Sequence, residues 1–521
     1  MKTLKKTAGW LVMAAALTVG MTACSNADSI AEEPQQQPEN PAKKTYTMTV
    51  VASKGGAITR ALSYNSSTKT LTATWEEGET VKVYKGSDEL GTLTAQSTGT
   101  TTTLSGTLEG TVAADDVLTL KHQRALIADQ DGTLTGGATS IDRTCDYAVA
   151  TVTVASAEGG VITIVGGEAA FQNQLAIVRF RLQNQSGTAM AASTLLVKLG
   201  GKDIIVKPAA DMSELYVAVP PVSDAEVKLY AIVNDGEKDV LYNYTRSGVT
   251  FTAGQFYAIA VKMIEGEVVT ISGTGTKTVQ DGQIVTGTVN ANIRVSIADG
   301  ATVMLRDAKI TSTNSAGISC LGDATIVVAG TNSTKSTCIG YPGIRVATGS
   351  NYTLTILGNG SLTATGKSGG AGIGGIKNNS VGNIIIAGGT IKANGSSGGG
   401  AGIGSAFCNT TGNGCSCGNI LIKGGTVTAS GSDGSYCGAG IGTGDSNTFV
   451  ENYSTCGNIT ITTGVTSVTA NTAGNWSIGK GNYLCTCGTI TIGCTLDEDG
   501  NPEGGTVYPD GITTNPFTYE P

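Results

Sequence analysis

The sequence Gly382-Asn-Ile-Ile-Ile-Ala-Gly-Gly-Thr-Ile-Lys-Ala-Asn394 decides the fold of the second half of the chain, because related copies of it recur. Gly-Asn-Ile begins copies at Gly382, Gly418 and Gly457, and Gly-Thr-Ile begins a fourth at Gly488. These starts follow one another at intervals of 36, 39 and 31 residues. Self-similarity at such a period is typical of solenoids, in which each repeat contacts only its neighbours.

Each copy holds three short strands and three turns. The second strands are 390–394, 426–430 and 467–471, and the third element is an Ala-Gly-Ile-Gly phrase. That phrase stands at 371–374, 401–404 and 439–442, with 476–479 as a variant and Thr337-Cys-Ile-Gly340 as a degenerate earlier copy. We therefore expect rungs of a right-handed parallel β-helix over residues 265–500, followed by a polar end at 501–521.

The columns that such rungs would form have suitable side chains. Isoleucines at 384, 420, 459 and 490 would stack about 4.8 Å apart in the lumen, and alanines at 393, 429 and 470 would fill a narrower corner. The glycine pairs 388–389 and 424–425 permit left-handed corners. The Gly-Ala-Gly-Ile-Gly phrases resemble those of glycine-rich, carbohydrate-binding β-helix surface proteins related in shape to pectate lyases. This resemblance implies a glycan ligand.

The first half has another composition. Residues 1–264 hold 23 of the 74 glycines, and the strand period dominates segments such as 46–51, 79–84, 176–181 and 225–232. Since turn residues separate these segments and no helical stripe is sustained, we expect a β-sandwich over 45–264. The whole protein is thus expected to be all-β.

Four segments of this half, in order, are similar to the fimbrillin-like family: 71–84, 171–179, 215–221 and 251–257. The resemblance implies a lipid-exported pilin or pilus-associated subunit with a double sandwich. In polymerising members a trypsin-like protease cuts after an arginine, and a neighbouring subunit's strand fills the groove that opens. Arg60 stands where that cut would fall, with an uncut loop arginine as the alternative. Pilus subunits are therefore expected partners.

The N-terminus carries an export address. Lys2, Lys5 and Lys6 precede an apolar run at 10–18, and Met21-Thr-Ala-Cys24 resembles the bacterial lipobox. The resemblance implies a signal peptide at 1–23, acylation of Cys24 and anchoring in the outer membrane of a diderm bacterium, at the cell surface. The proline- and glutamine-rich segment 24–44 is expected to be a disordered tether.

Composition excludes several functions. The chain has 521 residues with 33 basic and 41 acidic side chains, so nucleic acid is not an expected partner. His122 is the single histidine, which excludes sites that need two imidazoles. No Asp or Glu stands between Asp323 and Asp433, whereas glycosidases need two carboxylates and calcium-dependent lyases need an acidic cluster. We expect no catalytic residues, no bound metal and no cofactor. A calcium site near Asp433, Asp445 and Glu451 has no supporting ligand spacing.

The same acid-free interval carries six basic residues, so we expect a cationic strip that binds acidic glycans. Scattered solubilising lysines are the alternative. The candidate glycan-binding residues are Arg345, Lys367, Lys377, Lys392 and Lys423, with Lys335 as the sixth basic residue.

Ten cysteines lie between Cys320 and Cys494, and their placement follows the repeat. Cys417, Cys456 and Cys487 each precede the glycine of a strand start, with Cys415 and Cys485 two residues upstream. Three arrangements remain open: disulfide staples between rungs, a ladder of reduced thiols, or a metal site built from the two C-x-C pairs.

Together these features predict a non-enzymatic, lipid-anchored surface adhesin, or a tip or accessory subunit of a pilus, whose β-helix binds glycans. Two alternatives are a polysaccharide lyase-like enzyme that acts on acidic glycans and a purely structural surface spacer.

Overall fold

The computed structural model describes residues 43–55, 63–65, 70–72, 74–122, 127–349, 351–409, 415–432, 436–446, 454–482, 485–497 and 499–521. Nearly all regular structure in these residues is β, and the single helix, α1 (Ile141–Thr144), has one turn. The expected all-β class is confirmed. No helix within these residues has the length and apolar character to span a membrane. The expected signal peptide, tether and Cys24 lie outside the described residues, as does Arg60.

The first part of the chain forms an eight-stranded sheet that closes on itself. It closes because β1 pairs with β6 along ten residues on one side and with β10 and β11 on the other. The sheet encloses a core of alternating residues around the fully buried Trp75. A hairpin of β2 (Ser63–Asn65) and β3 (Thr70–Thr72) stands apart from it. The strands of the closed sheet are β1 (Lys44–Gly55), β4 (Thr80–Lys85), β5 (Asp88–Ala95), β6 (Thr101–Gly110), β7 (Val117–His122), β9 (Ala148–Ser156), β10 (Val161–Ile164) and β11 (Glu168–Asn173).

Two further sheets face each other and form a sandwich. The smaller has the order β15-β12-β18, and the larger has the order β19-β17-β16-β13-β14-β8. The expected single module at 45–264 therefore contains two separate cores. The strands are β8 (Asp129–Gln130), β12 (Ala176–Gln183), β13 (Ala192–Leu199), β14 (Lys202–Val206), β15 (Glu214–Val219), β16 (Val222–Asn234), β17 (Asp239–Phe251), β18 (Phe256–Lys262) and β19 (Ile264–Glu265).

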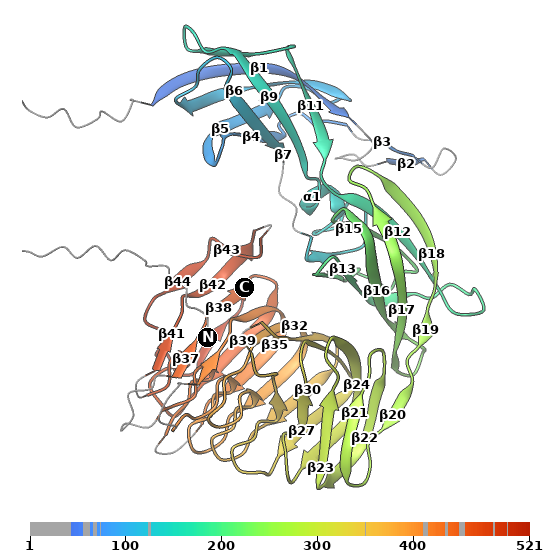
Figure 1. Cartoon of the computed structure of the whole chain (residues 1–521), viewed down its shortest axis with the longest axis vertical. Coiled ribbons are helices and arrows are strands. Elements are labelled where there is room, and N and C mark those ends of the chain that lie inside the picture. The colour runs from blue at the N-terminus through green and yellow to red at the C-terminus, as the bar shows by residue number, and fades with distance from the viewer. Residues whose placement is uncertain are drawn as a thin grey trace, which may run out of the picture. The chain divides into compact units, whose positions relative to one another are not determined.

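From Val268 onward the chain alternates between two long parallel sheets, in the stacked rungs that the repeat predicts (Figure 1). The first sheet holds both the first and the second strand of each rung. It consists of β20 (Val268–Thr270), β22 (Ile284–Ala291), β24 (Ala301–Ser312), β26 (Ala324–Ala329), β27 (Thr331–Ser336), β29 (Thr353–Gly358), β30 (Ser361–Thr365), β32 (Asn383–Asn394), β35 (Ile420–Ser430), β38 (Ile459–Thr462), β39 (Val465–Asn471) and β42 (Ile490–Leu496), with three C-terminal strands.

The other long sheet holds the third strands, and a short sheet holds the cysteine-containing segments. The third strands are β21 (Gly275–Val279), β23 (Ile293–Ile297), β25 (Ile318–Cys320), β28 (Ile344–Arg345), β31 (Ile373–Gly374), β33 (Ile403–Gly404), β36 (Ile441–Gly442) and β40 (Ile478–Gly479). The short sheet contains β34 (Ser416–Cys417), β37 (Ser454–Cys456) and β41 (Cys485–Cys487).

The predicted columns are confirmed residue by residue. Ile384 pairs with Ile420, Ile420 with Ile459 and Ile459 with Ile490, and all four are fully buried. The alanine column also forms. At the corners only the second glycine of each pair, Gly389 or Gly425, has a positive φ.

One predicted copy is wrong. Thr337-Cys-Ile-Gly340 does not form a third strand, and Ile339 is 72% exposed. Ile344 fills that column instead, because it pairs with Ile318 on one side and Ile373 on the other. The inward position is thus set by the register of neighbouring rungs and not by the similarity of the phrase.

The C-terminal residues expected as a polar end form three short strands. These are β43 (Pro502–Glu503), β44 (Thr506–Tyr508) and β45 (Phe517–Tyr519). They pair antiparallel with β42 and β39, so they occupy strand edges at the end of the stack. An edge covered in this way is not open to pairing with another chain.

The sandwich packs against the stacked rungs through a continuous apolar cluster. Alternate residues of the larger sandwich sheet, such as Leu196 and Ile232, contact outward side chains of the first strands, such as Met304, Val327 and Leu357. At the border of this cluster the Tyr230 hydroxyl donates to both carboxylate oxygens of Asp281, at 2.8 Å each. A pocket between the sandwich and the rungs borders this contact surface.

Candidate functional site

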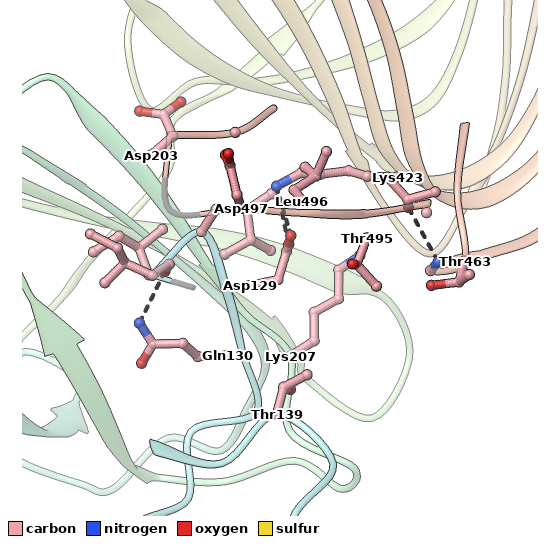
Figure 2. Close-up of a pocket in the computed structure, with 18 of the residues that line it drawn as sticks. Asp129, Gln130, Thr139, Asp203, Lys207, Lys423, Thr463, Thr495, Leu496 and Asp497 are labelled. Carbon is pink, nitrogen blue, oxygen red and sulfur yellow. Dashed lines mark hydrogen bonds and ion pairs between the residues drawn. The ribbon is translucent and has the colours of Figure 1, made fainter. Parts of the chain in front are cut away.

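A pocket of about 620 Å³ lies where the sandwich meets the rungs (Figure 2). Two segments of the sandwich, β8 and β14, contribute one wall. The corner of β35, the turn after β38 and the turn after β42 contribute the other. Ligand pockets commonly have volumes of about 300–1,000 Å³, so this one can hold a small organic molecule.

One ion pair crosses the pocket. The Lys423 ammonium donates to both carboxylate oxygens of Asp129, at 3.1 and 3.0 Å, across a sequence separation of 294 residues. The Lys423 side chain is 9% exposed and that of Asp129 is 41% exposed. The pair therefore has one buried and one solvated partner, and it ties the sandwich to the rungs.

A second lysine lies beside this pair. The Lys207 ammonium donates a hydrogen bond to the carbonyl oxygen of Ala387, on the rung side of the junction. The pKa of Lys207 is lowered, chiefly because its ammonium is removed from water. The Asp129 carboxylate opposes this shift, and the Lys423 ammonium adds to it. The position of Lys423 on the glycine corner of β35 brings the two cations close together.

Most of the remaining lining surface is apolar. Threonine hydroxyls, carboxylates and the backbone of glycine turns are placed within it. Asp497 is held in place by its own turn, since its Oδ1 accepts from the backbone N–H of Asp499 at 3.0 Å and of Asn501 at 2.7 Å. The polar lining residues include Gln130, Thr139, Lys202, Asp203, Thr463, Thr466, Thr495 and Asp499.

The predicted cationic strip is not a single surface. Lys423 lies in the pocket, and Lys392 projects from the second strand of its rung and is exposed. Arg345 lies on the third strand β28, where it donates to the Thr348 hydroxyl at 3.2 Å. Lys377 lies 5.1 Å from the centroid of the Phe407 ring. The candidates thus occupy different sides of the rungs.

Lys367 belongs to the same corner as Lys377. It is exposed, and its backbone N–H donates to the carbonyl of Tyr341 on the previous rung. Phe407 is packed there against Tyr436, with ring centroids 4.9 Å apart, and Tyr436 is 37% exposed. This corner therefore combines two lysines with aromatic rings.

The cysteine ladder forms in register. Cys417 pairs with Cys456 and Cys456 with Cys487, and these three are free thiols. Hydrogen bonds with both neighbours and burial raise the pKa of Cys456, whereas the bond from Cys456 lowers the pKa of Cys487. Among the three open arrangements, the structure has the reduced ladder at these positions.

The upstream cysteines behave differently from the ladder. Cys415 forms a disulfide with Cys408, which the repeat pattern did not indicate. Cys485 lies in register with Ser454, its thiol donates to the carbonyl oxygen of Gly444 at 3.4 Å, and burial raises its pKa. No group of three or more His, Cys, Asp or Glu side chains in the described part of the chain is arranged to hold a metal ion.

Sequence reasoning missed most of the pocket. The sequence identifies Lys423 by its charge, but it gives no signal for its partner Asp129 or for the lining residues Thr463, Thr495 and Asp497. The turns that carry them differ from rung to rung, so the repeat pattern gives no signal for them. Only the packing of the sandwich on the rungs brings them together.

Comparisons with known proteins give structural likenesses at low similarity. No family model and no curated protein matches the chain. Solved structures described as a "putative cell adhesion protein" from Bacteroides ovatus and another from Bacteroides uniformis are 14% and 12% identical, with TM-scores of 0.24 and 0.26. They cover 43% and 44% of this chain and 97% and 98% of their own.

A shaft pilin, SpaA, from Lactobacillus rhamnosus GG is 10% identical with a TM-score of 0.19, and it covers 42% of this chain and 97% of its own. At these TM-scores the likenesses decide neither the fold nor the function. The assignment of function therefore depends on the chain's own geometry.

Proposed function

We propose that the protein is a non-enzymatic surface adhesin that binds a saccharide in the pocket between the sandwich and the rungs. The observation that supports this most is the lining itself. A cavity of about 620 Å³ with a largely apolar surface also carries threonine hydroxyls, carboxylates, ammonium groups and glycine backbone, so it can contact both the apolar faces and the hydroxyls of a sugar. Both the sandwich and the rungs contribute to it, so binding would depend on the intact junction.

The proposal of a binding protein rather than an enzyme depends on how the pocket's carboxylates are used. Glycoside hydrolysis needs one carboxyl group that protonates the leaving oxygen and another that acts from the opposite side. Asp129 accepts two hydrogen bonds from Lys423, and Asp497 accepts backbone N–H groups of its own turn. These bonds hold both carboxylates on donors of the protein itself, so neither is placed as the proton donor of a hydrolase.

A glycan array tests the pocket. Thr463→Trp places a large side chain in the lining at an exposed position, while Thr107→Trp makes the same change on an exposed strand position of the closed sheet. We expect the native protein and the Thr107→Trp variant to bind the same saccharides and the Thr463→Trp variant to lose them. Equal binding by all three, or no binding by the native protein, would contradict the proposal.

We further propose that the chain is lipid-anchored at Cys24 and displayed on the outer membrane, since the lipobox resemblance and the candidate tether both support export. Cys24→Ser should release the protein from the membrane fraction of a diderm host. Retention of that variant in the membrane would contradict the lipid anchor.

We also propose that the chain is a fimbrillin-like module followed by a right-handed parallel β-helix, and that it joins a pilus as a tip or accessory subunit. A groove of about 210 Å³ in the sandwich supports this assembly. Its lining includes Phe180, Leu229 and Phe251, and it lies between β17 and the edge strand β18. An added strand could pair with that edge and cover the apolar lining.

The cut at Arg60 would matter for the same assembly. β1 lies between β6 and the β10–β11 pair, so removing the chain before residue 61 would take a central strand from the closed sheet. Limited trypsin digestion should then convert the native protein, but not an Arg60→Ala variant, into stable oligomers. Monomeric cleaved protein would count against the pilus role while leaving saccharide binding untouched.

A further inference from the structure

The second strands of successive rungs present one polar face to solvent, here called the polar face. Its central column consists of Lys309, Ser333, Thr363, Lys392, Thr428 and Thr469, paired in register from rung to rung. The column before it, from Thr331 to Ser467, contains only Ser and Thr. The column after it, from Thr311 to Asn471, contains Ser, Thr, Asn and one lysine, Lys335.

The outward direction of these side chains is fixed by the residues between them. Ile391 and Ala393 flank Lys392 in sequence and are buried in the lumen, and Val427 and Ala429 do the same on the next rung. A register shift of one residue would bring lysine into the lumen, so this face is strongly specified. The two-residue strand period therefore keeps the polar face free of aliphatic side chains.

The charge on this face has one sign. Lys309, Lys335 and Lys392 are exposed, and none of them forms a salt bridge with another described residue. Asp307 borders the face at a corner, but its Oδ1 accepts a hydrogen bond from the backbone N–H of Thr331 at 2.8 Å. A surface with three unpaired cations stands on a chain whose net charge is −8.

Neighbouring polar groups on the face are close enough to bond one another. The Asn394 amide donates to the Thr365 hydroxyl at 3.3 Å, and the hydroxyls of Thr469 and Thr518 lie 3.4 Å apart. Rungs repeat about every 4.8 Å, so Lys309 and Lys392, three rungs apart in one column, are separated by about 14 Å. The result is a long, regular array of hydroxyls and amides with widely spaced cations.

We propose that the polar face is a second ligand site, separate from the pocket, and that it binds a linear polysaccharide bearing sulfate or carboxylate groups. Hydroxyl and amide ladders match the alternating donors and acceptors of sugar rings, and the lysines supply ionic contacts at intervals. Duplex DNA carries one charge about every 1.7 Å, which three lysines over several rungs do not match. No aromatic side chain stands in the three columns for base stacking.

The test uses the full chain and two polymers: heparin, which is sulfated, and polygalacturonate, which is carboxylated. The variant Lys309→Gln/Lys335→Gln/Lys392→Gln removes the charges of the polar face. A matched control, Lys238→Gln/Lys262→Gln/Lys277→Gln, removes three exposed lysines elsewhere. We expect the first variant to bind at least one polymer about tenfold more weakly and the control to bind as the native protein does, since three exposed ionic contacts are lost together.

The salt dependence of binding and the Thr463→Trp variant distinguish the polar face from the pocket. Binding should weaken between about 0.1 M and about 1 M salt, because the screening length falls from about 10 Å to about 3 Å. Thr463→Trp should leave polymer binding intact. Failure of the native protein to bind either polymer, equal losses in both lysine variants, or loss in Thr463→Trp alone would overturn this inference. Tighter, equally lysine-dependent binding of duplex DNA would replace the glycan with nucleic acid and also overturn it.

Discussion

The substitution Lys54→Met tests whether burial decides the strength of an ion pair in the closed sheet. The Lys54 ammonium lies 3.1 Å from Glu79 Oε2 and 4.0 Å from Asp146 Oδ2, and its side chain is 1% exposed. Glu79 and Asp146 are 3% and 0% exposed, with His122 Nε2 3.4 Å from Asp146 Oδ2. The ammonium also lies 4.0 Å from the centroid of the Trp75 ring.

Removal of this cation takes an ammonium contact away from two buried carboxylates, Glu79 and Asp146. Breaking a buried pair by removing one partner costs about 3–5 kcal/mol, because the remaining charge is uncompensated. The pair Lys82–Glu89 is a matched control in the same sheet. Its N–O distance is 3.0 Å, but its side chains are 45% and 41% exposed. We expect Lys82→Met to cost about 1 kcal/mol or less.

Urea unfolding followed by Trp75 fluorescence in a Trp10→Phe/Trp476→Phe background measures both costs as shifts of the midpoint at unchanged slope. The double variant Lys54→Met/Glu79→Met should recover part of the loss, because the carboxylate nearest to the lost ammonium is then absent as well. If Lys54→Met and Lys82→Met shift the midpoint equally, burial does not set the strength of these pairs and the reasoning is refuted.

Three further predictions concern the rungs. Ile420→Ala should destabilise the protein by about 2–5 kcal/mol in calorimetry, because the side chain is fully buried between rungs. The control Leu421→Ala, on the outward side, should cost about 1 kcal/mol or less. Gly404→Ala should cost more than about 4 kcal/mol, since a Cβ there would lie 1.8 Å from a backbone carbonyl oxygen at a φ of +132°; near-native stability would contradict the stacking. Cys487 should react with iodoacetamide before Cys456 and at lower pH than an ordinary thiol, because its pKa is lowered and its thiolate forms earlier; mass spectrometry after brief labelling decides this.

The strand period and the repeat were enough to predict the rungs. Ile420 and Ala429 occupy the predicted columns because a rung contacts only the rungs beside it, so local similarity fixes the register. The exception, Ile339, shows the limit of that reasoning. Its phrase matches the repeat, but Ile344 pairs with both neighbouring rungs and takes the buried position.

The candidate site was predictable only in part. Lys392 and Lys423 share a basic, acid-free interval of the sequence, but Lys392 lies within the second strand of its rung and Lys423 lies at the corner before the second strand, so they face different sides. The cysteine column formed as the repeat predicted, whereas the repeat gives no indication that Cys408 and Cys415 form a disulfide. Position within a rung, and not proximity in sequence, decides which side chains meet.

The sequence by itself determined the all-β class, the rung period and the lumen columns, since these depend on patterns repeated within a few tens of residues. Only the tertiary structure decided that Asp129 meets Lys423 and that Lys54 shares a buried cluster with Asp146. These contacts join residues far apart in the chain. The first contact exists because the sandwich packs on the rungs, and the second because the eight-stranded sheet closes on itself. Both depend on the shapes of whole surfaces, which no local pattern encodes.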